Sequence, residues 1–433
     1  MSKNLPTSMT DLIDQVKEKF SGDPKIQTMF ESCFKNTYET TIRPQWDGST
    51  FVITGDIPAM WLRDSTAQVR PYLLLAEHDK HMADLIQGVI QKQVNYINHD
   101  PYANAFNETA NGNCYNEDKT DMTPWIWERK YEIDSLCYPI QLAYLFWKST
   151  GRTSHFNADF IKAVHQVIHT WQIEQYHFRK SSYQFIRENC PPQDTLANEG
   201  KGLPVNNTGM TWSGFRPSDD ACQYGYLVPA NMFAVVVLSQ VATISDEVFH
   251  DANLKKRAIH LADQINQGIQ TFGKVEHPLY GIIYAYETDG RGNYNLMDDA
   301  NVPSLLSMPY LGYCDVMDPI YQNTRRFITS VNNPYYYEGK IANGIGSPHT
   351  PKGYVWPIAL AMQGMTAKEG IEKDQILDLL KETDANTNFM HEGFHVDNPE
   401  RFTRPWFSWA NSMFSEFVLS RLGYFVKGSP LAK

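Results

Sequence analysis

The chain has 433 residues, 42% of them hydrophobic, which is ample for a large buried core. Its formal net charge is −11 and its Lys and Arg residues form no long cluster, so we expect no nucleic-acid partner, no membrane-surface partner and no polyanionic substrate. Aromatic residues reach 13%, and although many of them fill a core, the excess suits stacking on the apolar faces of sugars.

The six cysteines are scattered and form neither a CxxC pair nor a zinc spacing, so we interpret them as free thiols. The first residues carry no apolar signal-peptide core, and no run approaches the ~18 apolar residues of a membrane span. We therefore expect a cytoplasmic protein without a membrane segment. The sequence carries no signal for an oligomeric state.

Along the chain, polar loops alternate with segments whose apolar residues recur at helical spacing, such as Met82, Leu85, Ile86 and Val89. In most successive pairs the first segment is apolar nearly all round and the second is amphipathic, which is typical of a buried helix followed by a half-buried one. This alternation predicts one all-α domain over residues 1–433, an (α/α)6 barrel with an inner and an outer ring of helices. The expected helices are 24–42, 67–76, 82–97, 136–147, 157–171, 226–241, 254–271, 303–312, 319–331, 354–365, 368–382 and 407–422. Minor strands are expected only at 183–187 and 275–286.

Loops that precede the apolar helices share acidic and aromatic residues. They centre on Asp64, Asp134, Asp220, Asp299, His349 and Trp409. An Asp just before a helix is often only an N-cap, but a cap does not need the Trp61, Arg63 or Arg216 that these loops also carry. The N-terminal loops of an inner ring lie at one end, so we expect one pocket, in which the helix dipoles favour ionised carboxylates. The long loops 104–121 and 189–218 are expected to wall it.

Hydrolysis of a glycosidic bond needs two carboxyl groups, one protonated and one ionised. Spacing alone leaves the pair open among Asp56, Asp64, Glu128, Asp134, Asp219, Asp220, Asp298, Asp299, Glu392 and Asp397. Asp220 stands out because it precedes an apolar helix, where desolvation raises a carboxyl pKa. Glu392 stands out because it lies in a short, aromatic-flanked loop. Residues 391–395 do not form an HExxH pair, and 298–299 lack a calcium loop, so we expect no metal and no cofactor.

Four motifs together closely resemble glycoside hydrolase family 125. They are Gly55-Asp-Ile-Pro-Ala-Met-Trp-Leu-Arg-Asp-Ser65, Trp212-Ser-Gly-Phe-Arg-Pro-Ser-Asp-Asp-Ala221, Met297-Asp-Asp-Ala-Asn-Val-Pro-Ser-Leu-Leu306 and Gly344-Ile-Gly-Ser-Pro-His349. The resemblance extends from Arg43 to the end of the chain. It implies an exo-acting α-1,6-mannosidase with an (α/α)6 barrel and an inverting, metal-free mechanism, acting on terminal mannose of N-glycan-derived or similar oligosaccharides.

The same resemblance implies roles for individual residues. The family's general acid falls on Asp220 and its general base on Glu392. The residues expected to bind the sugar are Trp61, Arg63, Asp64, Glu128, Asp134, Arg216, Asp219, Asp299, Asn301 and His349.

Three alternatives remain from the residues themselves. They are a glycosidase of the same barrel with another specificity, a sugar epimerase of the same toroid, and a non-catalytic sugar-binding protein. Epimerases of this shape rely on pairs of histidines, whereas only His349 lies among the inner loops. A substrate panel with terminal α-mannose and α-glucose separates the glycosidases, and product formation separates an enzyme from a binding protein.

Overall fold

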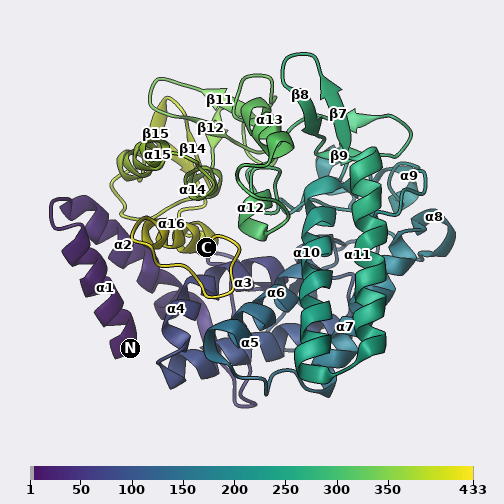
Figure 1. Cartoon of the computed structure of the whole chain (residues 1–433), viewed down its shortest axis with the longest axis horizontal. Coiled ribbons are helices and arrows are strands. Elements are labelled where there is room, and N and C mark those ends of the chain that lie inside the picture. The colour runs from purple at the N-terminus through teal and green to yellow at the C-terminus, as the bar shows by residue number, and fades with distance from the viewer. Residues whose placement is uncertain (1–3, 433) are drawn as a thin grey trace.

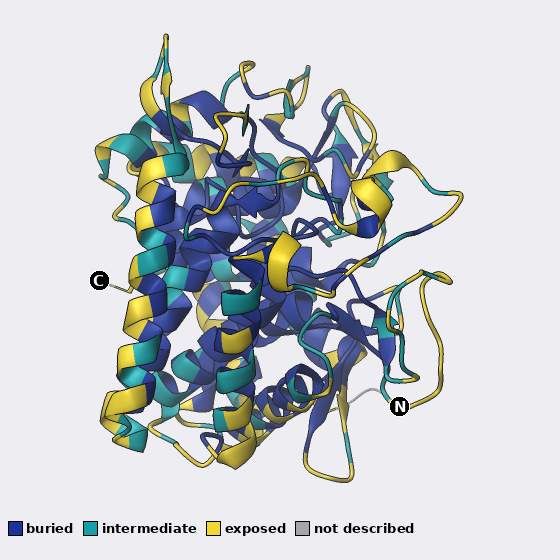
Figure 2. Cartoon of the chain, turned by 90° about the vertical axis from the view of Figure 1, so that its right-hand side faces the viewer, coloured by how far each residue is buried: buried dark blue, intermediate teal, exposed yellow. Residues whose placement is uncertain are grey.

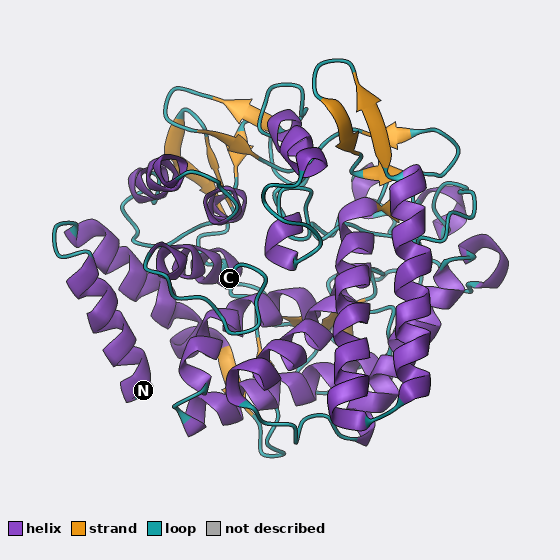
Figure 3. Ribbon diagram, viewed as in Figure 1, coloured by secondary structure: helices purple, strands orange, loops and turns teal. Residues whose placement is uncertain are grey.

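The structure is a computed structural model that describes residues 4–432. Helices dominate it, and strands are short and peripheral (Figure 3). The longer helices are α1 (Thr7–Lys19), α2 (Pro24–Asn36), α3 (Leu62–Val69), α5 (Lys80–His99), α6 (Ile133–Thr150), α7 (Ala158–Glu174), α10 (Val228–Ile244), α11 (Ala252–Phe272), α13 (Pro319–Ile328), α14 (Pro357–Met365), α15 (Gly370–Glu382) and α16 (Ser408–Arg421). The short ones are α4 (Leu73–Ala76), α8 (His177–Lys180), α9 (Ala197–Gly200) and α12 (Met308–Leu311).

The chain runs once around the molecule, so that its last helix returns to its first ones (Figure 1). Helix α6 packs against α3 on one side and α10 on the other, and α10 also contacts α12. Helix α16 packs against α14, α3 and α2, which joins the end of the chain to its beginning. The helices that follow these, α5, α7, α11 and α15, lie outside them and pack on their outer sides.

Most of the outer helices differ from the inner ones in how their N-termini are satisfied, although α15 also begins without a side-chain cap. The outer helices α2, α5, α7, α11 and α13 begin with side-chain caps, from Asp23, Asp79, Asn157, Asp251 and Asp318. The inner helices α3, α6, α10, α14 and α16 have no side-chain cap at their N-termini. Asp64 and Asp134 lie within the first turns of α3 and α6, not at the cap positions. Capping therefore does not explain these two carboxylates.

Strands pair locally and add no large sheet. The hairpin β7 (Lys274–His277) and β8 (Gly281–Tyr284) is antiparallel, as are β1 (Ile42–Pro44) with β2 (Thr50–Val52) and β11 (Tyr336–Glu338) with β12 (Asn343–Ile345). Three sheets have three strands each, in the orders β3-β4-β5, β10-β9-β6 and β13-β14-β15. Their strands are β3 (Met60–Trp61), β4 (Ala105–Phe106), β5 (Ile126–Glu128), β6 (Tyr226–Leu227), β9 (Glu287–Thr288), β10 (Tyr294–Asn295), β13 (Tyr354–Val355), β14 (Gly393–His395) and β15 (Asn398–Thr403).

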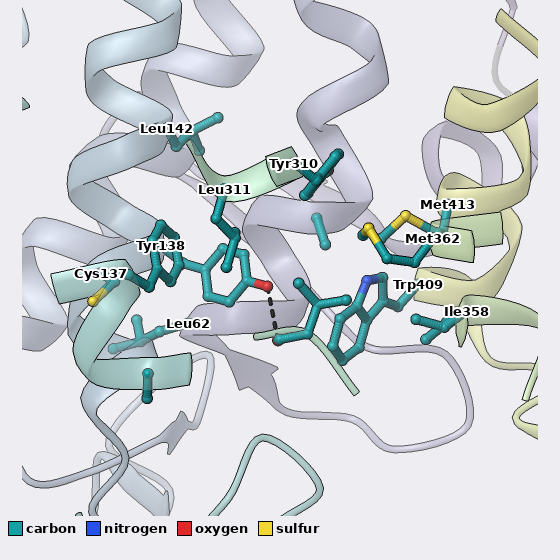
Figure 4. Close-up of a cluster of buried hydrophobic side chains, with 14 of the residues drawn as sticks. Leu62, Cys137, Tyr138, Leu142, Tyr310, Leu311, Ile358, Met362, Trp409 and Met413 are labelled. Atoms are coloured by element: carbon teal, nitrogen blue, oxygen red, sulfur yellow. Dashed lines mark hydrogen bonds between the residues drawn. The ribbon is translucent and has the colours of Figure 1, made fainter. Parts of the chain in front are cut away.

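One hydrophobic core runs through the molecule and fills the space between the inner helices. Exposed residues lie on the outward faces of the outer helices and in loops (Figure 2). At the centre, side chains from α3, α6, α12, α14 and α16 meet, and Tyr138 donates a hydrogen bond to the carbonyl of Val302 at 2.8 Å (Figure 4). Trp409 points into this cluster beside Met362 and Met413. The centre is therefore packed and is not an open channel.

The predicted helices are largely confirmed, and two predicted segments are corrected. The segment 303–312 is helical only at Met308–Leu311, because Ser304 and Ser307 bond each other and Asp298 accepts the Leu305 and Leu306 amides in a turn. The stretch 183–187 forms only one isolated bridge, between Ile186 and Lys119. The hairpin expected within 275–286 is confirmed.

One helix is long and apolar enough to cross a membrane, although the sequence has no uninterrupted apolar run of that length. Within Val228–Phe249, which is α10 with the turn that follows it, an 18-residue window has a mean hydropathy of 1.6, but 78% of that window is buried inside the protein. It lies between α6 and α11, so its apolar surface is covered by neighbouring helices.

Candidate active site

A pocket lies at the N-terminal ends of α3, α14 and α16. Its wall combines carboxylates, arginines and aromatic rings. The lining residues are Thr54, Ile57, Trp61, Arg63, Asp64, Pro217, Ser218, Asp219, Asn301, His349, Trp356, Glu392, Arg404, Phe407 and Trp409. Trp409 also belongs to the central apolar cluster, so the packed core closes the bottom of the pocket.

Seven of the twelve residues predicted for the site line this pocket. They are Trp61, Arg63, Asp64, Asp219, Asn301, His349 and Glu392. The other five, Glu128, Asp134, Arg216, Asp220 and Asp299, are buried behind the wall. The expectation that the loop residues converge is confirmed, because Asp134 pairs with Arg63, Asp220 bonds His349 and Asp299 accepts a hydrogen bond from Ser218.

Arg63 organises the acidic side of the pocket. Its Nη1 donates to Glu132 Oε2 at 2.5 Å and to Asp134 Oδ2 at 3.3 Å, and its Nη2 donates to Asp219 Oδ1 at 3.2 Å. Burial raises the pKa of Asp134 to about 6 against the lowering effect of Arg63. Burial likewise raises the pKa of Asp64 to about 6, again opposed by Arg63. One guanidinium thus compensates several buried carboxyl groups.

Asp219 and Asp220 point to different places, although they are adjacent in the chain. The Asp219 side chain is 24% exposed and lines the pocket, whereas that of Asp220 is 0% exposed and does not. The backbone of Asp219 has φ +65°, a left-handed conformation that is rare for a residue with a side chain and costs energy. This turn brings Asp219 to the pocket wall and places Asp220 directly behind it.

Behind the wall, Asp220 is the hydrogen-bond partner of His349. Its Oδ1 lies 3.0 Å from His349 Nδ1. Burial lowers the pKa of His349, but the hydrogen bond and charge of Asp220 outweigh that effect and raise this pKa to about 9. Near neutral pH His349 is therefore an imidazolium that lines the pocket with a positive charge.

Glu392 lies on the opposite arm of the site, held by the hairpin β14–β15. Gly393 pairs with Thr403, and the Glu392 amide bonds the Thr403 carbonyl, so Glu392 comes out beside Arg404. Arg404 Nη1 is 3.5 Å from Glu392 Oε1, and its Nε and Nη2 bond Asp56 at 2.6–3.2 Å. Arg404 thus connects the Glu392 carboxyl group to the loop that begins at Gly55.

Gly55 permits that connection. It has φ +136°, and a Cβ placed there would lie 2.4 Å from the Trp406 carbonyl oxygen. Only glycine allows the two strands to approach so closely. An isolated bridge between Gly55 and Phe407 joins the first motif of the sequence to the loop before α16.

The five residues behind the wall bind other parts of the protein. Glu128 accepts hydrogen bonds from Arg187 at 2.8 Å and Asn104 at 3.0 Å, and Arg216 donates to Glu287 at 2.6 Å. Asp299 accepts hydrogen bonds from Ser218 at 3.0 Å and from the Asn301 side chain at 3.1 Å. In the structure without a sugar, these side chains are therefore paired with other protein groups.

Two residues of the site, Arg404 and Glu132, were not predicted from the sequence. Arg404 precedes the last inner helix much as Arg63 begins α3, so its place before that helix was an available signal. Glu132 lies two residues before Asp134 in a motif that drew attention only to Asp134. Among residues 4–432, no group of three His, Cys, Asp or Glu side chains is placed to hold a metal ion.

A closed pocket with paired carboxyl groups, arginines and indoles on a helical scaffold has the features of a glycoside hydrolase. A family model described as metal-independent alpha-mannosidase (GH125) matches residues 23–419. The chain therefore belongs to this family, and it is a glycoside hydrolase.

Individual relatives agree with this assignment. A solved Streptococcus pneumoniae structure, from a study of metal-independent alpha mannosidases and in a non-productive substrate complex with alpha-1,6-mannobiose, is 49% identical with a TM-score of 0.95, covering 97% of this chain and 99% of that chain. The meiotically up-regulated gene 157 protein of Schizosaccharomyces pombe is 41% identical, covering 96% of this chain and 86% of that protein. A wild-type glycosidase structure with 12% identity and a TM-score of 0.55, covering 97% of this chain and 99% of that chain, shares the fold alone.

Proposed function

We propose that this protein removes terminal α-1,6-linked mannose from the non-reducing end of oligosaccharides such as those derived from N-glycans. The observation that carries the proposal is the pocket itself, which presents Asp219 and Glu392 as separate carboxyl groups, each paired with its own arginine. The relative at 49% identity, bound to alpha-1,6-mannobiose, supports the choice of linkage.

The proposed scaffold is a single (α/α)6 catalytic domain spanning residues 1–433. Support comes from the successive packing of the inner helices and from the return of α16 to α2 and α3. One contiguous core extends from Met9 to Val426. The pocket at the N-terminal end of the inner helices, closed below by that core, fits an enzyme that accepts one terminal sugar at a time.

In the proposed inverting mechanism, Glu392 accepts a proton from water as the water oxygen bonds to the anomeric carbon. The glycosidic bond breaks, and Asp220 gives its proton to the departing oxygen. At the end Glu392 is protonated, Asp220 is ionised, and the released mannose has the opposite anomeric configuration. Asp220 keeps the acid role that the family resemblance implies, and support comes from its Oδ2, which is buried and has no hydrogen-bond partner within the protein.

The other lining residues orient the sugar. His349, Arg63 and Asn301 are placed to bond hydroxyl groups, and Trp61 and Trp409 offer flat faces for the ring. Asp64 completes the polar wall.

Proton NMR of the nascent sugar tests the mechanism. Hydrolysis of an α-mannoside is expected to release β-mannose first, and activity on terminal α-mannose is expected to exceed activity on terminal α-glucose and to persist in EDTA. Appearance of α-mannose first would mean retention of configuration and a nucleophilic role for Glu392. Equal turnover of α-glucosides would overturn the substrate assignment.

We also propose that the enzyme acts in the cytoplasm on free oligosaccharide, without a nucleic-acid or membrane partner. All six cysteines are free thiols, which suits a reducing compartment. The net charge of −11 disfavours polyanionic partners. Fractionation of cells expressing the tagged full-length chain tests the location, and recovery with membranes would contradict it.

A further inference from the structure

The turn that carries Asp220 is closed by backbone hydrogen bonds, but one of its residues is strained. The Asp219 amide donates to the Arg216 carbonyl at 2.9 Å, and the Arg216 amide donates to the Asp220 carbonyl at 2.8 Å. The bridge between Phe215 and Ala221 continues this small hairpin. Within it Asp219 adopts the left-handed conformation, which persists in a residue with a side chain only where surrounding contacts fix it.

Lys130 supplies such a contact. Its Nζ donates to the Asp219 carbonyl oxygen at 2.7 Å, and no other group among residues 4–432 donates to this oxygen. The carbonyl belongs to the planar peptide group that joins Asp219 to Asp220, so its direction fixes the direction in which Asp220 leaves the turn. The same ammonium group lies 5.2 Å from the centroid of the Phe215 ring, and it therefore contacts the hairpin at two places.

The segment that carries Lys130 is itself anchored to this hairpin. The Lys130 amide donates to Asn104 Oδ1 at 3.1 Å. The carbonyl of the next residue, Tyr131, accepts hydrogen bonds from the Gly214 and Phe215 amides at 3.1 and 3.0 Å. Lys130 thus reaches the turn of the hairpin from a segment that is bonded to its first strand.

The charges around Lys130 keep it a donor. It is 2% exposed, and a buried ammonium group is costly unless partners replace water. Asp194 Oδ1 lies 3.3 Å and Glu128 Oε1 3.7 Å from its Nζ, whereas Glu128 has a closer cation in Arg187, at 2.8 Å. Burial lowers the pKa of Lys130, but the charges of Glu128 and Asp219 outweigh burial and raise this pKa above its ordinary value.

From this geometry we propose that Lys130 positions the general acid, by holding the Asp219–Asp220 peptide group so that the Asp220 carboxyl group stays beside His349. The inference rests on the proposed role of Asp220 as the acid. Asp220 Oδ1 lies 3.0 Å from His349 Nδ1, and Oδ2 is buried without a partner in the protein. Lys130 does not line the pocket, so it acts only through Asp220. Rotation of the peptide group would displace Oδ2, and displacements of about 1 Å are enough to impair catalysis.

Lys130→Met tests the proposal, because methionine is also unbranched but has no donor. We expect turnover of α-1,6-mannobiose, which has a poor leaving group, to fall by about 10²-fold, within the range of general acid catalysis. Turnover of 2,4-dinitrophenyl α-mannoside, whose leaving group needs no protonation, is expected to change by less than about 10-fold. A merely structural role would lower both alike, so equal losses, or no loss, would overturn the proposal.

Arg187→Met is the matched control. It also removes a buried positive charge from Glu128, but Arg187 makes no hydrogen bond to Asp219. Its effect is expected to be the same on both substrates. A selective loss of mannobiose turnover in this variant too would mean that the charge near Glu128, and not the bond to Asp219, is responsible, and would overturn the proposal.

Asp220→Asn distinguishes a failure of this proposal from a failure of the proposed function. A selective loss of mannobiose turnover in Asp220→Asn, together with equal losses in Lys130→Met, would overturn the role of Lys130 alone. Equal losses on the two substrates in Asp220→Asn would remove Asp220 from the role of acid, and the role of Lys130 with it.

A second pair of variants applies if Lys130→Met does not fold. Lys130→Met combined with Glu128→Gln removes both members of an ion pair, which avoids an uncompensated buried charge. Relative to Glu128→Gln alone, the combined variant is expected to lose about 10²-fold on mannobiose and less than about 10-fold on the aryl mannoside. A combined variant that matches Glu128→Gln on both substrates would overturn the proposal.

The pKa of His349 is a readout that does not depend on turnover. Burial lowers this pKa, and Asp220 raises it to about 9, with Glu392 and Asp219 also facing the ring. Loss of the Lys130 charge would by itself raise the pKa of His349, whereas withdrawal of Asp220 lowers it. We therefore expect NMR titration of 15N-histidine to show a lower His349 pKa in Lys130→Met than in the wild type. An unchanged or higher pKa would show that Asp220 keeps its place without Lys130, and would overturn the proposal.

Discussion

At the scale of single residues, Asp220 illustrates how a buried carboxylate acts through a neighbour. His349 is predicted to stay charged until its pKa of about 9, well above the ordinary value of 6.5, because Asp220 outweighs the effect of burial. Since the pKa is raised in the folded state, this pair stabilises the fold fully below about pH 6.5, and the contribution is lost as pH rises through about 9. In Asp220→Asn we expect the His349 pKa to fall below 6.5, because burial remains and the charge is gone.

The measurement is NMR titration of 15N-histidine, with the His349 resonances assigned through a His349→Gln variant. Glu392 and Asp219 also face His349, so their contribution is checked with Glu392→Gln, where a smaller decrease is expected. A His349 resonance that still titrates near pH 9 in Asp220→Asn would show that Asp220 does not set its charge.

Arg404 makes a second prediction at this scale, on the base side of the pocket. Its guanidinium bonds Asp56 through two nitrogens and reaches Glu392 with a third. Lysine keeps the charge but lacks this planar fork, so Arg404→Lys is expected to lower kcat by about 10²-fold through misplacement of Glu392. Both mannobiose and aryl mannosides are expected to lose activity alike, because Glu392 activates water for each.

Arg401→Lys is the control for that substitution, since Arg401 lies on the same strand β15 and is exposed. Its kinetics are expected to match the wild type. A strong preference of the Arg404→Lys defect for mannobiose would place Arg404 on the acid side and contradict the assignment.

At the scale of helices, the side-chain caps of the outer helices are expected to affect stability but not catalysis. Asp251 accepts hydrogen bonds from the Asn253 and Leu254 amides at 3.0 and 2.9 Å, at the start of α11 on the outside of the molecule. Asp251→Ala is expected to lower the free energy of unfolding by about 1 kcal/mol and to leave kcat/KM unchanged. Urea unfolding and mannobiose kinetics measure the two effects.

Asp263 provides the comparison, because it is an exposed aspartate within the same helix. Asp263→Ala is expected to change stability by less than about 0.5 kcal/mol. Equal losses in the two variants would mean that charge, and not capping, is responsible.

Most of the helices were predictable because their apolar pattern is local. Helix α10 is apolar on nearly every side and α11 on one stripe, which indicates buried and half-buried positions without any knowledge of neighbours. The length of the four-residue α12 was overestimated. The turn before it depends on Asp298, which accepts the amides of residues seven and eight positions later. Such capture of the backbone by a side chain leaves no periodic signal.

The site was predictable by residue type but not by orientation. The motifs brought Arg63, His349 and Glu392 to one pocket, whereas the fact that Asp219 lines its wall and Asp220 lies behind it depends on one left-handed backbone angle. The function of Arg404 depends on Asp56, 348 positions away in the chain. Contacts of this kind follow from the closure of the whole fold and cannot be inferred from spacing.

At the scale of the whole molecule, closure of the pocket determines where a chain of sugars is cut. Trp409 lines the pocket and also packs with Met362 and Met413 in the central cluster, so a sugar that enters meets a packed floor (Figure 4). A substrate chain cannot pass through, and only its terminal residue reaches the carboxyl groups of the pocket. We expect α-1,6-mannotriose with a fluorescent label at its reducing end to lose unlabelled mannose one residue at a time, so that labelled mannobiose appears before labelled mannose.

Chromatography of early time points measures this order. The control is the same trisaccharide capped by a methyl group on O6 of its non-reducing mannose, which should resist hydrolysis. Labelled mannose released while the trisaccharide is still abundant and no labelled mannobiose has formed would mean that internal bonds reach the carboxyl pair, and that the floor seen here is open in solution.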